Sequence, residues 1–73
     1  MRVKTLQQTT ERYVKGSVRS FLEGHKDLEW IGGTLLRSGL PKQPTLQIVL
    51  PLMTYGDPPR AASLLGWLQK TDW

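Results

Sequence analysis

Residues 46–52 read Leu-Gln-Ile-Val-Leu-Pro-Leu, and this stretch decides which fold class the sequence predicts. Its apolar residues alternate, so in an extended chain one face would carry Leu46, Ile48, Leu50 and Leu52. The alternation predicts a β-strand over residues 45–52. Pro51 has no N–H to donate to a neighbouring strand, which indicates that this strand lies at the edge of a sheet.

The segment before this strand also indicates β-structure, and it has two interpretations. Residues 28–31 (Leu-Glu-Trp-Ile) and 34–37 (Thr-Leu-Leu-Arg) suit a pleated surface, and Gly32 and Gly33 separate them. The glycine pair is either the turn of a type I′ hairpin or a bulge inside one strand over residues 28–36. The first interpretation gives three short strands. The second gives an antiparallel pair with the strand at 45–52, joined by a turn at 38–44.

An amphipathic helix is predicted before these strands, from residue 6 to residue 23. Thr5 and Gln8 have the spacing of a capping box, and Gly24 stands where a left-handed C-terminal cap is expected. The apolar residues follow a 3.6-residue period, which indicates a buried stripe. Its predicted members are Leu6, Tyr13, Val14, Val18, Phe21 and Leu22.

A second helix is predicted at the end of the chain, from residue 58 to about residue 69. Asp57 is a favourable N-cap and Pro58 suits the first helical position. The predicted buried stripe consists of Ala61, Leu64, Leu65 and Leu68, with Trp67 beside it. The sequence as a whole therefore predicts an α+β fold: an N-terminal amphipathic helix, a two- or three-stranded antiparallel sheet and a C-terminal helix.

Length and composition limit how this chain can be organised. Its 73 residues fit one small domain with an arm at 1–5 and a tail at 70–73, and the absence of cysteine excludes disulfides. A domain of this size is marginally stable alone, so a homodimer is expected, with strand 45–52 pairing across a two-fold axis. The first residues lack the apolar segment of a signal peptide, and no apolar run approaches about 20 residues. We therefore expect a cytoplasmic protein, or an intracellular one in a host if the chain is viral.

The order of elements resembles the small α-β-β-α domains of the alkaline-shock-protein family of bacterial envelope-stress proteins. The resemblance is carried by the basic helix 10–22, the strand 28–36, the turn 41–44 (Pro-Lys-Gln-Pro), the strand 46–52, and residues 56–59 (Gly-Asp-Pro-Pro), which open the helix 61–68. This resemblance implies a non-enzymatic, self-associating protein that is attached to a membrane through its partners.

No group of residues indicates catalysis or metal binding. His25, the one histidine, follows the glycine that ends the first helix, and the carboxylates Asp27 and Glu29 are too few for a metal site. Gly32 and Gly33 lack the spacing of a phosphate-binding loop, and no serine stands in the context of a nucleophile. We expect no cofactor, no metal and no enzymatic activity.

Two binding hypotheses remain. In the first, the chain is a small protein-protein interaction module, a regulator or inhibitor, whose aromatic side chains anchor a protein partner. The candidate anchors are Trp30, Tyr55, Trp67 and Trp73. In the alternative, the chain binds DNA or RNA through its basic N-terminal third, since ten Lys and Arg residues against six acidic residues give a net charge of +4. The candidate phosphate contacts are Arg2, Lys4, Arg12, Lys15, Arg19 and Lys26.

Overall fold

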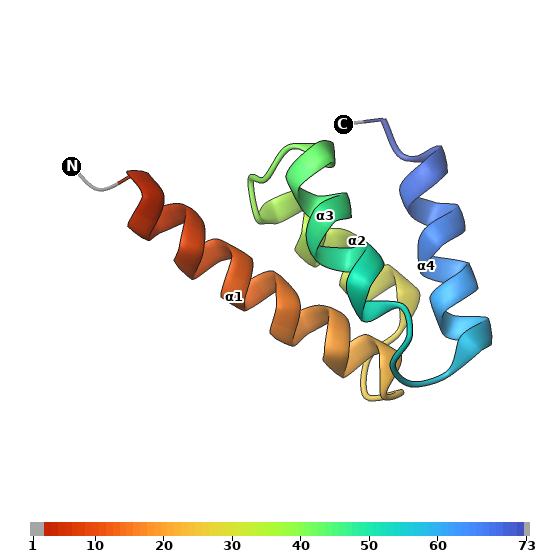
Figure 1. Cartoon of the computed structure of the whole chain (residues 1–73). Coiled ribbons are helices and arrows are strands. Elements are labelled where there is room, and N and C mark those ends of the chain that lie inside the picture. Colours follow the sequence, from red (N-terminus) through yellow and green to blue (C-terminus); the bar gives the residue numbers. More distant parts are fainter. Residues whose placement is uncertain (1–2, 73) are drawn as a thin grey trace.

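The computed structural model describes residues 3–72, and side chains from residue 8 to residue 72. Within this part the chain forms four helices and no strand: α1 (Val3–Leu22), α2 (Leu28–Arg37), α3 (Lys42–Leu52) and α4 (Pro58–Lys70) (Figure 1). The α+β prediction is therefore wrong, and the described chain is all-α.

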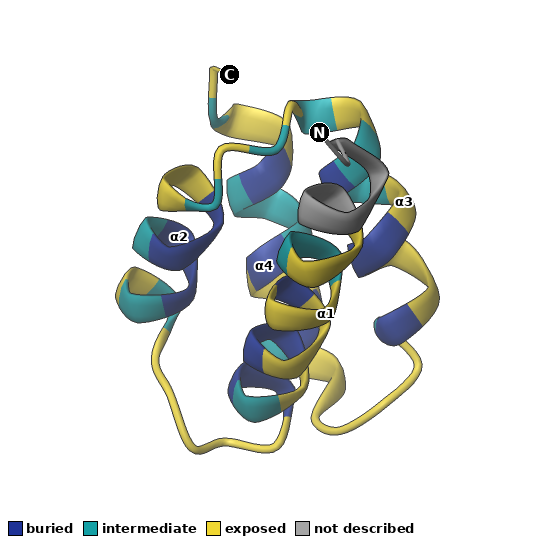
Figure 2. Cartoon of the chain, turned by 90° about the vertical axis from the view of Figure 1, so that its left-hand side faces the viewer, coloured by how far each residue is buried: buried dark blue, intermediate teal, exposed yellow. Residues whose placement is uncertain are grey.

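The helices pack around α1, which contacts the other three, while α2 also packs against α4. α1 and α3 run in the same direction and α2 and α4 run in the opposite direction (Figure 1). The buried segments of all four helices face a common centre (Figure 2), and their buried residues form one hydrophobic cluster. This core consists of Val14, Val18, Phe21 and Leu22 from α1, Ile31 and Leu35 from α2, Ile48, Val49 and Leu52 from α3, and Ala61, Leu64 and Leu68 from α4.

The predicted edge strand at 45–52 is helix α3. Thr45, Ile48, Val49 and Leu52 are buried, and their spacing of three, one and three residues places them on one side of a helix. The two prolines are tolerated because of their positions: Pro44 lies in the first turn, where N–H groups have no helical partner, and Pro51 lies in the last. Without a strand, the predicted dimer by strand pairing has no edge to form on.

The predicted strand or hairpin at 28–37 is helix α2. Asp27 caps it, because the Asp27 Oδ1 accepts a hydrogen bond of 2.7 Å from the Trp30 N–H. Gly32 and Gly33 lie in the middle of the helix and form neither a turn nor a bulge. A Cβ on Gly32 would stand 3.0 Å from Cε2 of Trp67, so the missing side chain lets α4 approach α2 closely.

The two predicted helices are confirmed, with corrections to α1 and to Leu65 of α4, which is half-buried instead of buried. α1 begins at Val3, so Thr5 lies inside it and is not its N-cap, and Tyr13 is 57% exposed instead of buried. Leu6 lies outside the residues whose side chains are described. The C-terminal cap is as predicted: Gly24 has φ +90°, its N–H donates to the Phe21 carbonyl, and the N–H of His25 donates to the Ser20 carbonyl, which is a Schellman motif. α4 begins at Pro58 after the N-cap Asp57.

One corner of the molecule joins the end of α1 to the start of α4. The N–H of Asp57 donates to the Leu22 carbonyl over 3.2 Å, and Gly56, at φ +72°, lies directly against that carbonyl. Arg60 donates from Nε to the Phe21 carbonyl over 2.7 Å and from Nη2 to the carbonyl of Lys26. The Phe21 carbonyl also accepts from the Gly24 N–H, so Arg60 adds a second donor there, and these bonds together fix the loop that carries Tyr55.

Candidate binding groove

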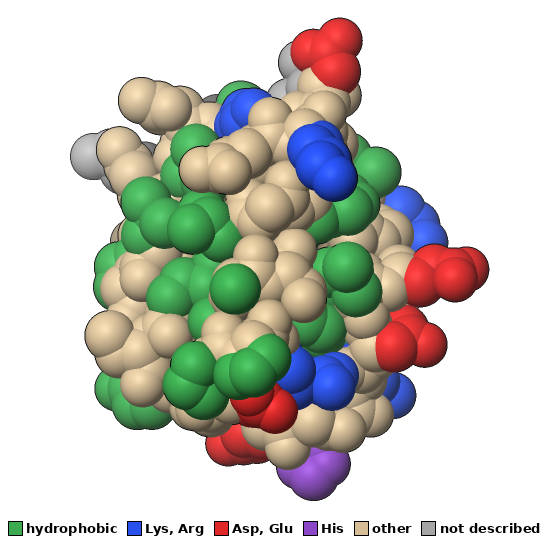
Figure 3. Space-filling view, turned by 90° about the vertical axis from the view of Figure 1, so that its right-hand side faces the viewer, with side chains coloured by type: hydrophobic (Ala, Val, Ile, Leu, Met, Phe, Trp, Pro, Cys, Tyr) green, Lys and Arg blue, Asp and Glu red, His purple; other side chains and the backbone are tan. Residues whose placement is uncertain are grey.

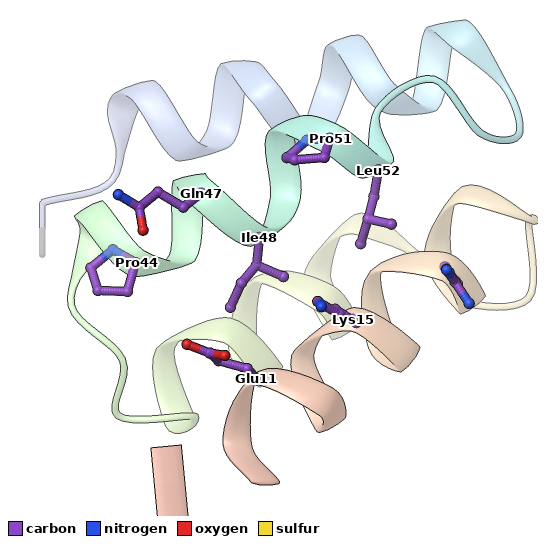
Figure 4. Close-up of a pocket in the computed structure, with 8 residues that line it drawn as sticks. Glu11, Lys15, Pro44, Gln47, Ile48, Pro51 and Leu52 are labelled. Atoms are coloured by element: carbon purple, nitrogen blue, oxygen red, sulfur yellow. The ribbon is translucent and has the colours of Figure 1, made fainter. Parts of the chain in front are cut away.

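A groove of about 350 Å³ runs between α1 and α3 (Figure 4). We call it the α1–α3 groove. α1 supplies one wall with Glu11, Lys15 and Arg19, and α3 supplies the other with Pro44, Gln47, Ile48, Pro51 and Leu52. One wall is therefore charged and the other is mainly apolar.

The charged wall exists because its three residues are spaced four apart along α1 and so share one side of the helix. Arg12 and Lys15 are exposed, and neither forms an ion pair within the part of the chain that the structure describes. Arg19 lies over the ring of Tyr55, with its guanidinium carbon 5.7 Å from the ring centroid. Tyr55 thus lies at one end of this wall, in contact with Arg19. Lys15 takes no part in that contact, so its ammonium group can bind an anion.

The apolar wall is the side of α3 that turns from the core toward α1. Ile48 and Leu52 are core residues, 7% and 6% exposed, whose edges reach the groove. Pro51 cannot donate the usual helical hydrogen bond to the Gln47 carbonyl, because proline has no N–H. The wall therefore combines apolar contact area with a break in the helical hydrogen-bond pattern at Pro51.

Two further depressions extend the groove along α1. One, of about 450 Å³, is lined by Gln8, Glu11, Arg12 and Lys15, and the other, of about 240 Å³, is lined by Arg19, Glu23 and Tyr55. Each shares at least one residue with the α1–α3 groove. At a rise of about 1.5 Å per residue, the distance from Gln8 to Glu23 is about 22 Å, which is the length of a four-turn helix.

The predicted aromatic anchors are not gathered at one site. Trp30 and Trp67 are half-buried and pack against the core, Trp30 on α2 and Trp67 on α4. Tyr55 is 53% exposed and lies in the loop between α3 and α4. Trp73 lies outside the described residues. Of the described anchors, Tyr55 alone lines the depressions along α1.

Three of the predicted basic residues are brought together: Arg12, Lys15 and Arg19 line the groove and its extensions. Lys26 lies beyond the end of α1, with its ammonium nitrogen 5.1 Å from the centroid of the Trp30 ring. Arg2 and the side chain of Lys4 lie outside what the structure describes.

Sequence reasoning found the α1 wall but missed the α3 wall. The sequence predicts a turn that ends at Pro44 and a strand over residues 45–52, in which alternate residues would point to opposite faces. The signal that could have found the wall was the helical spacing of Thr45, Ile48 and Leu52, which competes with the alternation in the same stretch.

Other chemistry is sparse in the described chain. Residues 3–72 contain no cluster of three His, Asp or Glu side chains able to hold a metal ion. The ion pair that the described side chains do form joins His25 Nε2 to Glu23 Oε1 over 3.8 Å, with both side chains largely exposed. None of the described helices is both long and apolar enough to cross a membrane.

Comparisons with models of protein families, with curated proteins and with solved structures found no match. The resemblance to the alkaline-shock-protein family is therefore untested, although the strands on which it was based are helices. The function has to be inferred from the groove itself.

Proposed function

We propose that this protein is a small, non-enzymatic interaction module that binds an acidic amphipathic segment of a partner protein in the α1–α3 groove. The observation that carries the proposal is the pairing of two unlike walls. A helical segment with apolar residues on one side and carboxylates beside them would place the former on Ile48 and Leu52 and the latter on Lys15 and Arg19.

The dimensions and charges support this type of ligand. The groove and its extensions match a helix of about four turns. From Glu11 to Arg19 the chain carries three cations and one acidic residue, a net charge of +2, so this stretch attracts carboxylates. The absence of enzymatic activity and the cytoplasmic or host-intracellular location remain predictions.

The experiment is a selection from a displayed library of random peptides of about 16 residues, a length that matches the groove. We expect enriched peptides to combine Asp or Glu with Leu or Phe at helical spacing. A fluorescein-labelled enriched peptide then gives a Kd by fluorescence anisotropy. Lys15→Glu with Arg19→Glu should weaken its binding by about tenfold or more, because two favourable charge contacts become repulsive.

The matched control is Arg37→Glu with Lys70→Glu, which changes the net charge equally at exposed positions on α2 and α4. This control should bind the peptide within about twofold of the original chain, since long-range charge has a small effect at physiological salt. Equal weakening by both double variants, or enrichment of basic peptides, would overturn the proposal.

Nucleic-acid binding is the second candidate, and the exposed row of Arg12, Lys15 and Arg19 favours it. Phosphate contacts would use this row without the apolar wall. Light scattering with random DNA and RNA across salt concentrations separates the candidates. Complexes that dissociate as salt is added, and that do not form when all three cations are changed to Glu, would support nucleic-acid binding over peptide binding. We favour the peptide because the row lies beside Ile48 and Leu52, which offer nothing to a phosphate.

A further inference from the structure

The α3 wall of the groove contains a backbone carbonyl whose usual helical donor is missing. In an α-helix each carbonyl accepts a hydrogen bond from the N–H four residues later. The residue four positions after Gln47 is Pro51, which has no N–H. Gln47 and Pro51 both line the groove. Because a helical carbonyl points along the axis toward the residue four positions later, the Gln47 carbonyl lies between these two side chains.

No side chain of the described residues replaces the missing donor. At the end of α3 the Leu50 carbonyl accepts from the Met53 N–H, and the Pro51 carbonyl accepts from the Thr54 hydroxyl. The described side chains form no hydrogen bond with Gln47. Gln47 and Pro51 are exposed, so water solvates this carbonyl in the unbound protein.

A ligand in the groove removes that water. Ile48 and Leu52 point from α3 toward α1, whereas Gln47 and Pro51 lie along the outer edge of the groove (Figure 4). A helix that rests on Ile48 and Leu52 therefore has one flank over this edge. A carbonyl that loses its water without gaining a donor costs free energy, so a ligand that supplies a donor binds more tightly than one that does not.

The electrostatics of α3 favour a donor with positive charge. The C-terminal end of a helix carries a partial negative charge, and α3 has no basic residue in its last turn. Lys42 lies at the other end of α3 and donates to the Thr71 carbonyl, while Arg60 donates to the Phe21 carbonyl. The side of the molecule that α4 forms is mainly apolar and uncharged (Figure 3). A cation at the end of α3 therefore has to come from the ligand.

Lysine and arginine also fit the shape of this edge. Their aliphatic stems pack on apolar surface, here the ring of Pro51, while the charged group reaches a polar atom beyond it. Lys and Arg side chains near helix C-termini donate to carbonyls in this way within single chains. A side chain from a bound segment has the same geometry available.

We infer that the partner segment carries a Lys or Arg on the side opposite its carboxylates, and that this side chain donates to the Gln47 carbonyl. The inference rests on the proposed function and specifies its ligand further. Across the bound helix, carboxylates meet the charged wall, apolar residues cover the apolar wall, and one cation reaches over the outer edge. The segment stays acidic overall. Pro51 determines this specificity, because an N–H at position 51 would occupy the carbonyl.

The experiment compares the labelled peptide from the library selection with the same peptide in which that cation is changed to Met. Fluorescence anisotropy gives the Kd of each peptide for the original chain and for Pro51→Ala. The original chain should bind the cationic peptide about fivefold more tightly. Pro51→Ala should bind the two peptides within about 1.5-fold of each other, because the alanine N–H then bonds to the Gln47 carbonyl.

Pro44→Ala is the matched control. Pro44 also lines the groove, but it lies in the first turn of α3, where N–H groups have no helical acceptor. The change removes the same ring without occupying a carbonyl, so it should change the Kd of both peptides by the same factor. Enriched peptides without a Lys or Arg opposite their carboxylates, a preference that Pro51→Ala retains, or one that Pro44→Ala abolishes would each overturn the inference.

A spectroscopic measurement on the original chain tests the hydrogen bond directly, and it serves if Pro51→Ala does not fold by circular dichroism. The carbonyl ¹³C resonance of Gln47 is detected through the N–H of Ile48. It should move downfield when the cationic peptide binds and move less with the Met peptide, because a charged donor polarises the carbonyl. An equal shift with both peptides would contradict the inference.

The inference and the proposed function fail in different ways. If no peptide is enriched, or if Lys15→Glu with Arg19→Glu binds the peptide as the original chain does, the proposed function fails and the inference fails with it. If that double variant loses the peptide but the original chain shows no preference for the cation, the groove still binds acidic segments and the inference alone fails.

Discussion

The two ends of the α1–α3 groove are held in different ways. Near Tyr55, hydrogen bonds join residues far apart in the sequence: Asp57 donates to Leu22, and Arg60 donates to Phe21 and Lys26. Near Pro44, a long-range bond joins α3 to the end of α4, from Lys42 Nζ to the Thr71 carbonyl over 3.4 Å, but the turn at 38–41 is held by bonds between neighbours, and none of these bonds reaches α1. The Ser38 hydroxyl donates to the Leu35 carbonyl over 2.6 Å, and that of Thr45 to the Pro41 carbonyl over 2.9 Å.

This difference tells us which end of the groove can adapt to a ligand. Bonds between distant segments fix the position of one helix relative to another, whereas bonds within a turn fix the turn alone. We therefore expect the end of α3 near Leu52 to keep its distance from α1, and the end near Pro44 to move when a peptide enters.

The largest expected effect comes from Gly56, at the fixed end. A Cβ there would overlap the Leu22 carbonyl oxygen, and φ is +72°. Gly56→Ala should lower the free energy of unfolding by about 3 kcal/mol or more, because steric overlap adds to backbone strain. Urea denaturation followed by circular dichroism measures it.

Gly24→Ala is the matched control for that prediction. Gly24 also has positive φ, at +90°, but a Cβ there would meet nothing within 4 Å. Its replacement should cost about 1–2 kcal/mol, the strain of a left-handed alanine alone. Equal costs for the two variants would show that the approach of Gly56 to Leu22 does not stabilise this corner.

Arg60 gives the second largest expected effect. Besides its hydrogen bonds, its guanidinium carbon lies 4.7 Å from the centroid of the Phe21 ring. Arg60→Lys keeps the positive charge but cannot reach both carbonyls and stack on the ring, so it should cost about 2 kcal/mol in urea denaturation. Arg37→Lys, at an exposed position, should cost less than about 0.5 kcal/mol. A result for Arg60→Lys as small as that for Arg37→Lys would mean that the corner does not depend on the guanidinium.

The two helices that meet at this corner, α1 and α4, are also the ones that the sequence predicts well. α1 and α4 are long enough for a 3.6-residue period to be recognised, and Gly24, Asp57 and Pro58 mark their ends. The basic wall of the groove follows from the same period, since the spacing of Arg12, Lys15 and Arg19 places them on one side of α1.

α3 could not be predicted in this way because it has apolar residues on two sides. Ile48 and Leu52 face the core and α1, while Leu46 is half-buried and Leu50 is 48% exposed. Together they alternate along the chain as the residues of a strand do. A short apolar run does not distinguish a strand from a helix with apolar residues on two sides, because the packing of this segment against α1 decides which of the two forms. The α3 wall of the groove was missed for this reason.

α2 was misassigned for a different reason. A glycine pair normally weakens a helix, by about 1 kcal/mol for each glycine. In this fold the absence of a side chain at Gly32 makes room for Trp67, which is 35 positions later in the sequence. Local propensity contains no information about that contact. The N-cap Asp27, directly before the helix, was the local signal that could have indicated α2.

Gly32→Ala tests whether α2 and α4 pack as closely against each other as the end of α1 packs against the start of α4. Its Cβ would lie 3.0 Å from two carbon atoms of the Trp67 ring, so the ring or α4 must shift. We expect a net cost of about 1 kcal/mol in urea denaturation, because overpacking exceeds the gain in helix propensity.

Gly66→Ala on α4 is the control for Gly32, because nothing lies within 4 Å of its Cβ position. It should stabilise the protein by up to about 1 kcal/mol. A gain of similar size for both variants would show that Trp67 yields easily and that the contact between α2 and α4 is loosely packed.

The smallest effect is expected at the adaptable end of the groove, from Ser38→Ala. The change removes the hydroxyl that donates to the Leu35 carbonyl and accepts a 3.3 Å hydrogen bond from the N–H of Leu40. Global stability should fall by about 0.5–1 kcal/mol. Because these bonds are local, amide hydrogen exchange should accelerate at Leu40 and Thr45 and stay unchanged at Asp57. Acceleration of Asp57 to the same extent would mean that the two ends open as one unit, so that the groove could not widen near Pro44 while staying closed near Tyr55.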